Sequence, residues 1–447
     1  MAEPTRVVIL GGGFGGTAVA RRLERLVGRD ASVEITLVDR ENFALFTPLL
    51  PEVPSGAVEP KHVVSPLRAL LRRTIVRHAE VRSIDFAKRT VLVSHCPRCR
   101  IAVLPWDHLV LALGSVPNFF GLPNVAAHAL TMKNLADASA LHAHVVDKFE
   151  HADMEEDPAV RRELLTFIVV GGGFAGVETA GELNDFVRGA GPFYPRLGRD
   201  DVRVVLVHLG SRILPEVSEP LSAYALTKLR SRGVDVRLAT RIDEYTGTLA
   251  RLSSGDEIPS RTLVWTAGIV ANPVLGALGV PTTSAGKVEV TDTLEVKGCR
   301  GVWALGDCAV VVDRATGRPY PPTAQHAVRQ GRRVADNIVA TIRGRASTPF
   351  AHRPLGILAG LGRHSAVAEI LGFRFSGFFA WWLWRTVYLL KLPGLERKVR
   401  VALDWTLDLF FPRDIVYLRP LHLSQGSGPV GGEVPAHEPD PRGSGPR

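Results

Sequence analysis

Cysteine is scarce in this chain, with four residues among 447. So few cysteines exclude a disulfide framework. Cys96 and Cys99 form a C-x-x-C pair, but zinc takes about four ligands and only His95 is an obvious third. We therefore expect no metal site and place this pair in a surface hairpin, where it is either oxidisable or pairs between subunits. Cys299 and Cys308 are expected to be packing residues.

A long hydrophobic run is also absent. The most apolar stretch, residues 375–392, is interrupted by Arg385 and Lys391. It falls short of the roughly 18 uninterrupted apolar residues of a membrane-spanning helix. Residues 1–6 lead directly into a strand and a glycine loop, so we expect no signal peptide. The sequence predicts a cytosolic protein that touches a membrane without crossing it.

Negative charge is in deficit, because 54 Lys and Arg face 45 Asp and Glu and give a formal net charge of +9. This balance favours an anionic partner, which can be a nucleotide phosphate, a nucleic acid or an acidic membrane surface. Neither zinc-finger spacing nor an RNA-binding aromatic signature accompanies the charge, so we expect no nucleic acid partner.

Glycine, in contrast, is plentiful, and a glycine-rich loop follows a short apolar strand at residues 6–10. The glycines occupy the G-x-G-x-x-G positions at Gly11, Gly13 and Gly16. This spacing allows a tight turn, close approach of a pyrophosphate and close helix–strand packing. A helix at 17–26 and a second strand at 33–38 follow, and Asp39 ends that strand where a carboxylate binds ribose hydroxyls. The unit predicts dinucleotide binding.

The pattern recurs in mid-chain, which indicates a second nucleotide-binding domain. A strand at 165–170 precedes the loop, and a helix at 177–188 and a strand at 201–207 follow it. The loop glycines are Gly171, Gly173 and Gly176. His208, with Arg212 nearby, stands where an acid is expected. A neutral histidine can bond a ribose and does not repel a 2′-phosphate, so NADH and NADPH both stay open. The alternative is that His208 is a solvated strand end.

These repeats predict an α/β fold with two Rossmann-like dinucleotide-binding domains. We expect these domains to be followed by a C-terminal amphipathic helical region for membrane association. Residues 301–307 suit a strand that ends in Gly-Asp and returns the chain to the first domain. The expected boundaries are 1–120 with 291–345 for the discontinuous first domain, 121–164 for a helical connector, 165–290 for the second domain, 346–421 for the C-terminal region and 422–447 for a disordered tail.

The C-terminal region is aromatic and basic between residues 373 and 411. A second helix is expected after residue 394. Its polar stripe consists of Arg397, Arg400, Asp404 and Asp408, and its largely apolar stripe of Val399, Ala402, Leu403, Thr406 and Phe410. Aromatic residues with cationic flanks suit an interfacial helix pair on anionic lipid. A dimer interface or a buried helix pair is the alternative.

Several local motifs together resemble the type II NADH:quinone oxidoreductases of the FAD-dependent pyridine nucleotide-disulfide oxidoreductase superfamily. The resemblance extends from residue 6 to about residue 421. It is carried by residues 11–16, 37–40, 46–50, 109–114, 171–178, 265–268, 304–307 and 322–325. The absence of cysteine before residue 96 disfavours the disulfide reductases and sulfide:quinone oxidoreductases among the relatives.

This resemblance implies FAD at the first loop and NADH at the second. The implied FAD site comprises Gly11, Gly13, Phe14, Gly15, Gly16, Asp39, Arg40, Thr47, Val81, Gly114, Asp307, Ala324, Gln325 and Ala327. The implied NADH site comprises Gly171, Gly173, Gly176, Glu178, His208 and Gly268. Asp307 would bond the ribityl chain, and the helix that begins near Ala324 would direct its N-terminus at the flavin ring, where the dipole stabilises added electron density.

The resemblance also implies hydride transfer from NADH to FAD and then transfer of two electrons to a membrane quinone, without proton pumping. Glu178 is the candidate for proton delivery near the nicotinamide, and its alternative role is that of a carboxylate favoured by a helix start.

Gln325 is the candidate quinone contact, because an amide can donate to a quinone oxygen. The family often shows Ala-Gln-x-Ala-x-Gln-Gln, whereas here Arg329 replaces the second glutamine and Gln330 fills the third position. Gln325, Arg329 and Gln330 are thus the expected quinone contacts, with Gln330 alternatively a solvated helix residue.

The expected partners are a quinone and an anionic membrane surface, at the cytoplasmic face of the cell membrane, where the protein would be peripheral. A homodimer stays open. The alternative function is that of a soluble NAD(P)H-dependent reductase of a ferredoxin-like redox protein, and a redox-sensing interaction module without turnover is the third.

Overall fold

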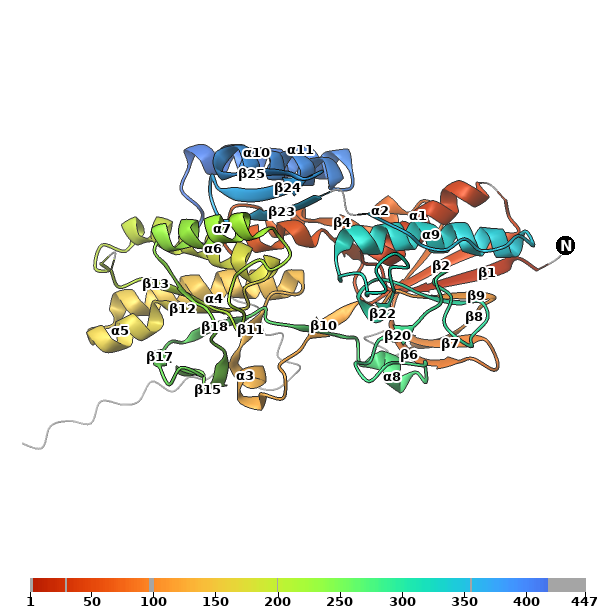
Figure 1. Ribbon diagram of the computed structural model, residues 1–447, viewed down its shortest axis with the longest axis horizontal. Coiled ribbons are helices and arrows are strands. Elements are labelled where there is room, and N and C mark those ends of the chain that lie inside the picture. The colour runs from red at the N-terminus through yellow and green to blue at the C-terminus, as the bar shows by residue number, and fades with distance from the viewer. Residues whose placement is uncertain (1–2, 29, 96–99, 199, 354–355, 417–447) are drawn as a thin grey trace, which may run out of the picture. The chain divides into compact units, whose positions relative to one another are not determined.

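The computed structural model describes residues 3–28, 30–95, 100–198, 200–353 and 356–416. Our predictions for Cys96, Cys99 and residues 422–447 lie outside this part of the chain. Within it the fold class is α/β, as predicted. Two parallel sheets with flanking helices are accompanied by a C-terminal sheet and a pair of helices (Figure 1).

The first sheet has five parallel strands. In spatial order they are β21 (Val302–Ala304), β9 (His108–Leu111), β1 (Thr5–Leu10), β2 (Val33–Asp39) and β5 (Ile75–His78). These strands read as nearly continuous apolar runs, which is typical of a sheet that is buried on both faces. Because β21 pairs with β9, the chain beyond residue 290 returns to the sheet that its first residues begin.

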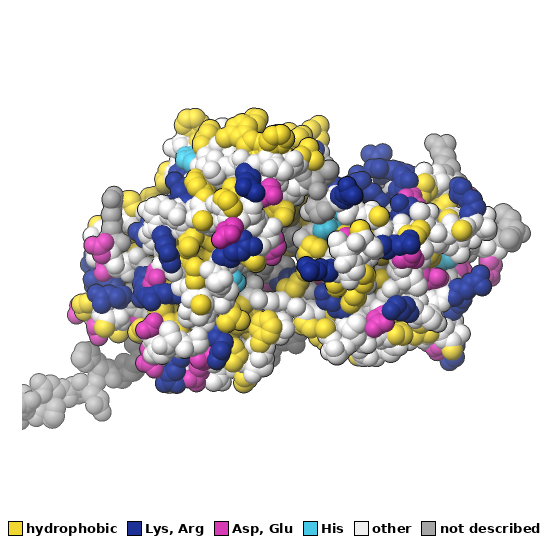
Figure 2. Space-filling view, viewed as in Figure 1, with side chains coloured by type: hydrophobic (Ala, Val, Ile, Leu, Met, Phe, Trp, Pro, Cys, Tyr) yellow, Lys and Arg dark blue, Asp and Glu magenta, His cyan; other side chains and the backbone are white. Residues whose placement is uncertain are grey.

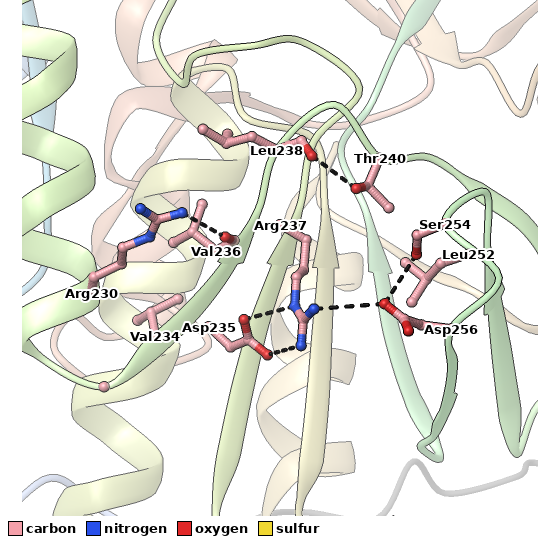
Figure 3. Close-up of a pocket in the computed structure, with 11 residues that line it drawn as sticks. Arg230, Val234, Asp235, Val236, Arg237, Leu238, Thr240, Leu252, Ser254 and Asp256 are labelled. Carbon is pink, nitrogen blue, oxygen red and sulfur yellow. Dashed lines mark hydrogen bonds and ion pairs between the residues drawn. The ribbon is translucent and has the colours of Figure 1, made fainter.

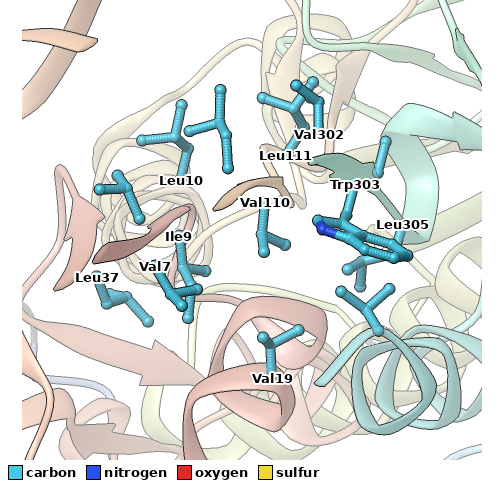
Figure 4. Packing of buried hydrophobic residues seen from close by; sticks show 14 of the residues in the cluster. Val7, Ile9, Leu10, Val19, Leu37, Val110, Leu111, Val302, Trp303 and Leu305 are labelled. Carbon is cyan, nitrogen blue, oxygen red and sulfur yellow. The ribbon is translucent and has the colours of Figure 1, made fainter. Parts of the chain in front are cut away.

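Two helices beside this sheet, α1 (Phe14–Val27) and α9 (Ala324–Ile342), pack against each other. A Cβ atom on Gly331 would lie 2.5 Å from the carbonyl oxygen of Gly15, so glycine is required for this close approach. The core between sheet and helices includes Ile9, Val19 and the fully buried Trp303 (Figure 4).

The second sheet repeats the arrangement of the first. In spatial order its parallel strands are β11 (Leu130–Thr131), β18 (Thr262–Trp265), β12 (Thr166–Val170), β13 (Arg203–Val207) and β14 (Val234–Arg237). Its helices are α6 (Phe174–Ala190) and α7 (Glu219–Ser231). The helices α4 (Leu135–Met154) and α5 (Pro158–Leu164) precede β12, and Phe149 of α4 stacks on Phe167 of β12.

The helices after both glycine loops begin three residues earlier than the sequence predicted. α1 starts at Phe14 rather than Thr17, and α6 at Phe174 rather than Val177. The last glycine of each loop is already helical, because its lack of a Cβ lets the first turn press against the preceding strand end. A Cβ on Gly16 or on Gly176 would collide with the carbonyl of the first loop glycine.

Smaller elements complete the described chain. Antiparallel sheets are formed by β6 (Glu80–Asp85), β7 (Thr90–His95) and β8 (Arg100–Pro105), and by β15 (Ile242–Tyr245), β16 (Leu249–Leu252) and β17 (Glu257–Pro259). Paired short strands are β3 (Phe43–Leu45) with β4 (Val64–Pro66), β10 (Ser115–Pro117) with β19 (Ile269–Ala271), and β20 (Val288–Glu289) with β22 (Ala309–Val310). Short helices are η1 (Thr47–Glu52), η2 (Pro60–His62), α2 (Leu67–Leu70), α3 (Pro123–His128), η3 (Gly191–Phe193), α8 (Val274–Ala277) and η4 (Gly306–Cys308).

The C-terminal region consists of an antiparallel sheet and two helices. The strands are β23 (Gly356–Gly360), β24 (Ala366–Ile370) and β25 (Phe373–Ser376), and the helices are α10 (Gly377–Lys391) and α11 (Leu395–Phe410). Among the described residues, no helix combines the length and the hydropathy needed to cross a bilayer.

The two helices α10 and α11 carry apolar side chains on both sides. Those buried against the protein include Trp381, Trp384, Val401 and Trp405. Apolar side chains that are more than half exposed line their outer side: Phe378, Phe379, Trp382, Leu390, Leu395, Val399, Leu403, Leu407 and Phe410. In contrast, Asp408 is buried, and Asp404 accepts from His62 Nδ1 at 2.6 Å. Two acids of the predicted polar stripe of α11 thus face the protein. Figure 2 shows the apolar side chains gathered over this helix pair. We call them the apolar face.

Candidate functional site

The first glycine loop joins β1 to α1 and is tied to the end of β2. Gly11 donates its N–H to the carbonyl of Val38 at 2.8 Å, and Gly12 donates to Oδ2 of Asp39. Gly11 has a φ of 106°, a conformation that favours glycine. Asp39 therefore stands beside the loop, where the sequence predicted a ribose-binding acid.

This loop leaves room for an anion at the start of α1. Gly13 is the N-cap residue and provides no side-chain cap, so the first N–H groups of the helix stay available. A Cβ on Gly13 would meet no atom within 4 Å, which shows open space in front of these donors. Donors and a helix dipole that face open space fit a diphosphate.

The second loop has the same construction. Gly171 donates to the carbonyl of Val207 at 2.8 Å, and its φ is 119°. Gly173 is the uncapped N-cap residue of α6, and a Cβ on it would again meet no atom within 4 Å. Gly172 donates to Nδ1 of His208 at 3.0 Å. His208 directly follows β13, is half-buried and is bonded to the loop, which favours a role at the loop over a fully solvated strand end.

A polar group forms where η4 meets β10. Asp307 accepts from the hydroxyl of Ser115 at 2.7 Å, and the ammonium of Lys133 lies 3.6 Å from the same carboxylate. Lys133 also donates to Ser115 at 2.8 Å. Asp307 was predicted from the Gly-Asp motif, whereas Ser115 and Lys133 were missed because no spacing pattern links them to it. Gly114 precedes Ser115 with a φ of 67°.

The helix α9 begins at Ala324, as predicted, and its N-cap residue Thr323 makes no side-chain cap. Gln325 and Arg329 share a face, and the Arg329 guanidinium donates to the Gln325 carbonyl at 3.1 Å. Burial lowers the pKa of Arg329, and Arg332 adds to this effect. Ala327 packs near Gly306.

Gln330 has a role that the sequence did not suggest. Its side chain is buried, and its amide oxygen accepts from the N–H of Gly306 at 2.8 Å. The alternative of a solvated helix residue is therefore wrong. Gln330 holds the loop that carries Asp307.

The remaining residues implied by the resemblance make the following contacts. The rings of Phe14 and Phe46 meet edge to face, with their centroids 5.8 Å apart. Phe46 directly precedes Thr47, the first residue of η1. The carbonyl of Arg40 accepts from His78. Val81 pairs with Val93 within the small sheet that contains β6. The carbonyl of Gly268 accepts from the N–H of Asn118 at 3.0 Å.

Glu178 is buried on the second turn of α6. Its Oε1 accepts from the N–H of Gly360 at 2.9 Å and from the indole N–H of Trp384 at 3.3 Å. Burial raises the pKa of the Glu178 carboxyl to about 8, against the opposing effect of these two hydrogen bonds. The group is therefore largely protonated at neutral pH, which differs from an exposed carboxylate at a helix start. Both partners come from the C-terminal region.

Two further acids, Glu52 and Glu182, are buried close to Glu178 and were missed because single glutamates in apolar segments carry no motif. Glu52 accepts from the indole N–H of Trp405 at 2.6 Å, and burial raises its pKa to about 7. Glu182 accepts from Ser55 at 3.1 Å and pairs with Arg413 at 2.9 Å. Burial raises the pKa of Glu182 as well.

Arginines link this acidic group to the C-terminal helices. Arg413 also pairs with Asp408 at 2.9 Å, and Arg385 of α10 lies 3.7 Å from Asp408. The Arg385 guanidinium lies 4.0 Å from the ring centroid of Trp381 and 4.8 Å from that of Trp405. We refer to Glu52, Glu178, Glu182, Arg385, Asp408 and Arg413 as the buried ionic cluster.

A hollow of about 710 Å³ lies along the edge strand β14 (Figure 3). Arg230 on its rim donates to the carbonyl of Val236 at 3.1 Å, and its other charged side chains are bonded to one another. Arg237 pairs with Asp235 at 2.9 Å and with Asp256 at 3.6 Å, and Ser254 donates to Asp256. This hollow therefore presents few free polar groups, and neither glycine loop lines it.

The thiol of Cys308 is buried, and this burial raises its pKa to about 11. Such a thiol is unreactive, as expected of a packing residue. Within the described part of the chain, no group of three or more His, Cys, Asp or Glu side chains is arranged to hold a metal ion.

Comparison with known proteins gives consistent matches. Residues 5–331 match the family model of the pyridine nucleotide-disulphide oxidoreductases, and residues 355–414 match that of the NDH2 C-terminal domain. The type II NADH:quinone oxidoreductase Ndh of Mycobacterium tuberculosis is 32% identical over 91% of this chain and 89% of its own length. A probable NADH dehydrogenase of Dictyostelium discoideum is 32% identical over 92% of this chain and 91% of its own length.

The fold matches a solved structure closely. NDH2 from Plasmodium falciparum, solved in complex with NADH, superimposes with a TM-score of 0.86 at 18% identity and covers 93% of this chain and 100% of that chain. A ferredoxin reductase from Rhodopseudomonas palustris gives a TM-score of 0.63 and covers 82% of this chain.

Proposed function

The chain belongs to the type II NADH:quinone oxidoreductase family, and on this premise we propose that it oxidises NADH and reduces a membrane quinone through bound FAD, without pumping protons. One observation carries the proposal. Glu178, on the helix after the second dinucleotide loop, is bonded to Trp384 of a helix whose other side belongs to the apolar face. A single hydrogen bond thus connects the helix that follows the second dinucleotide loop with a helix of the apolar face.

The residues of the first loop fit FAD. The free N–H groups at the start of α1 would hold the diphosphate, and Asp39 the ribose. Asp307, held by Ser115 and by the Gln330 contact to its loop, would bond the ribityl chain. When bound, FAD supplies hydride acceptance and onward delivery of the electron pair.

Glu178 is proposed to hold the proton that quinone reduction consumes. A general acid works best when its pKa lies near the operating pH. Burial raises the pKa of the Glu178 carboxyl group to about 8, which is close to that pH. The N–H groups of Gly360 and Trp384 fix the orientation of its carboxyl group. The second loop, with its free helix N-terminus, would take NADH.

Gln325 and Arg329 are proposed as the donors to the quinone oxygens, since they lie together at the start of α9. We assign Gln330 a positioning role instead, because its amide oxygen is already bonded to Gly306.

The apolar face is proposed to seat the enzyme peripherally on anionic lipid at the cytoplasmic face of the cell membrane. Aromatic and aliphatic side chains would enter the headgroup boundary, and the exposed Lys391 and Arg400 of the same helices would meet lipid phosphates. The alternative of a soluble ferredoxin reductase is disfavoured, because it gives the NDH2-type C-terminal region and this apolar face no role.

The testing experiment is steady-state oxidation of NADH by flavin-loaded protein with ubiquinone and menaquinone analogues as acceptors. We expect stoichiometric quinol formation. Bleaching of the flavin by NADH without quinone turnover, but with rapid reduction of a ferredoxin, would favour the alternative function instead.

A further inference from the structure

His208 occupies in the second loop the position that Asp39 holds in the first. Val207 pairs in register with Val170, as Val38 pairs with Leu10. The next residue in each case, His208 or Asp39, receives the N–H of the second loop glycine. At the equivalent position the first site thus has a carboxyl group, that of Asp39, and the second site has an imidazole ring, that of His208.

The His208 ring is neutral in this arrangement. Gly172 donates its N–H to Nδ1, so Nδ1 is an acceptor and the ring proton resides on Nε2. Burial lowers the pKa of the ring, and the backbone of Arg212 and the charge of Glu216 oppose this only in part. A carboxylate at this place would repel a 2′-phosphate, whereas the neutral ring does not.

The charged residues that follow His208 most closely along the chain are Arg212 and Glu216. Arg212, four residues beyond His208, donates to the carbonyls of Pro215 and Val217. Among the described residues no carboxylate lies within ion-pair distance of Arg212, so its charge is not neutralised. Glu216 is the acid that acts on the His208 ring, and it is exposed, so solvent screens it.

We propose that the second loop takes NADPH as well as NADH, and that His208 is the residue that permits it. This inference rests on the proposed function. The reaction keeps its balance: NADPH, quinone and one proton give NADP⁺ and quinol, with the hydride leaving C4 of the nicotinamide. The adenosine 2′-phosphate would lie beside the neutral His208 ring.

Binding of nucleotide fragments tests the inference without any turnover. We expect 5′-AMP and adenosine 2′,5′-bisphosphate to bind the flavin-loaded wild-type protein with dissociation constants within about tenfold of each other in calorimetric titration. His208→Asp restores the repelling carboxylate and is expected to weaken the bisphosphate at least about tenfold while 5′-AMP changes little. The matched variant His208→Asn, which adds no charge, is expected to retain both ligands.

Steady-state turnover with each nucleotide is a second, independent test of the inference. The ratio of kcat/KM for NADH to that for NADPH is expected to rise at least about tenfold in His208→Asp relative to His208→Asn. A wild-type protein that binds 5′-AMP but not the bisphosphate would overturn the inference and leave the proposed function intact. Conversely, loss of quinone reduction with both nucleotides bound would overturn the proposed function alone.

Discussion

At the scale of single residues, the unusual feature is a carboxyl group kept protonated by its surroundings. Glu178 accepts its hydrogen bonds from one backbone N–H and one indole N–H, and neither donor carries a charge. An ionised carboxylate in such a place is poorly solvated, so the neutral acid is favoured. The same environment that opposes ionisation makes the proton available for transfer.

Glu178→Gln is expected to lower quinone-dependent turnover at least about tenfold, because the amide keeps the acceptor for Gly360 and Trp384 but has no transferable proton. Bleaching of the flavin by NADH in stopped flow should persist. In the wild-type protein, turnover should fall as pH rises through the raised pKa of about 8, because the acid form is then lost.

Glu219→Gln on the first turn of α7 is the matched control, since it makes the same side-chain replacement at an exposed position. Equal turnover of Glu178→Gln and Glu219→Gln would contradict the assignment of Glu178 as the proton-holding group.

At the scale of elements, the helices and strands that the sequence predicted well are those determined by residues close to them along the chain. The strands and helices around Gly11 to Gly16 and Gly171 to Gly176 follow from apolar runs and glycine spacing, whereas the start of α9 near Ala324 was implied by the family resemblance. Such patterns depend on neighbours within about twenty residues along the chain.

The parts that the sequence did not show depend on distant contacts. Glu52 meets Trp405 across 353 positions, and Glu178 meets Trp384 across 206. The orientation of α11 was open for the same reason: its two stripes were visible, but only the bonds of Asp404 to His62 and of Asp408 to Arg413 decide which stripe faces the protein.

This orientation leads to a prediction for the apolar face. Leu403→Glu with Leu407→Glu places two charges on the exposed side of α11, and we expect co-flotation with vesicles containing anionic phospholipid to be lost. Reduction of a long-tailed quinone in those vesicles should fall, whereas reduction of a short-chain water-soluble analogue should persist.

Ser231→Glu, at the exposed end of α7, is the control for added charge and should float as the wild type does. If the double variant still floats but changes from dimer to monomer in light scattering, the apolar face is a subunit interface and the membrane proposal fails.

At the scale of the whole molecule, the buried ionic cluster joins segments from the three parts of the chain. Glu52 lies in η1 near the first loop, Glu182 lies on α6, and Arg413 follows α11. Removing one partner of such a cluster leaves an uncompensated buried charge. The cluster therefore makes the stability of the C-terminal region depend on the protonation of acids in both nucleotide-binding parts.

The dependence on pH has a definite sign between pH 7 and 8.5. The carboxyl pKa values of Glu52 and Glu178 are raised from 4.5 to about 7 and about 8, so the native state holds protons there that the unfolded chain has released. Stability conferred by those protons is lost as pH rises through the raised values. The histidines His108 and His144, with pKa values lowered to about 4, affect stability only below about pH 6.5, where the unfolded chain takes up protons.

We therefore expect the free energy of unfolding in urea to decrease by on the order of 1 kcal/mol from pH 7 to 8.5 for the flavin-loaded protein. Glu178→Gln should flatten this decrease, because its amide does not titrate, whereas Glu219→Gln should leave the slope unchanged. A free energy of unfolding that rises over this interval, or an equal slope in Glu178→Gln, would show that Glu178 ionises in the folded protein at its ordinary pKa. The structure predicts the opposite, because Trp384 and Gly360 together offset only part of the cost of burying its charge.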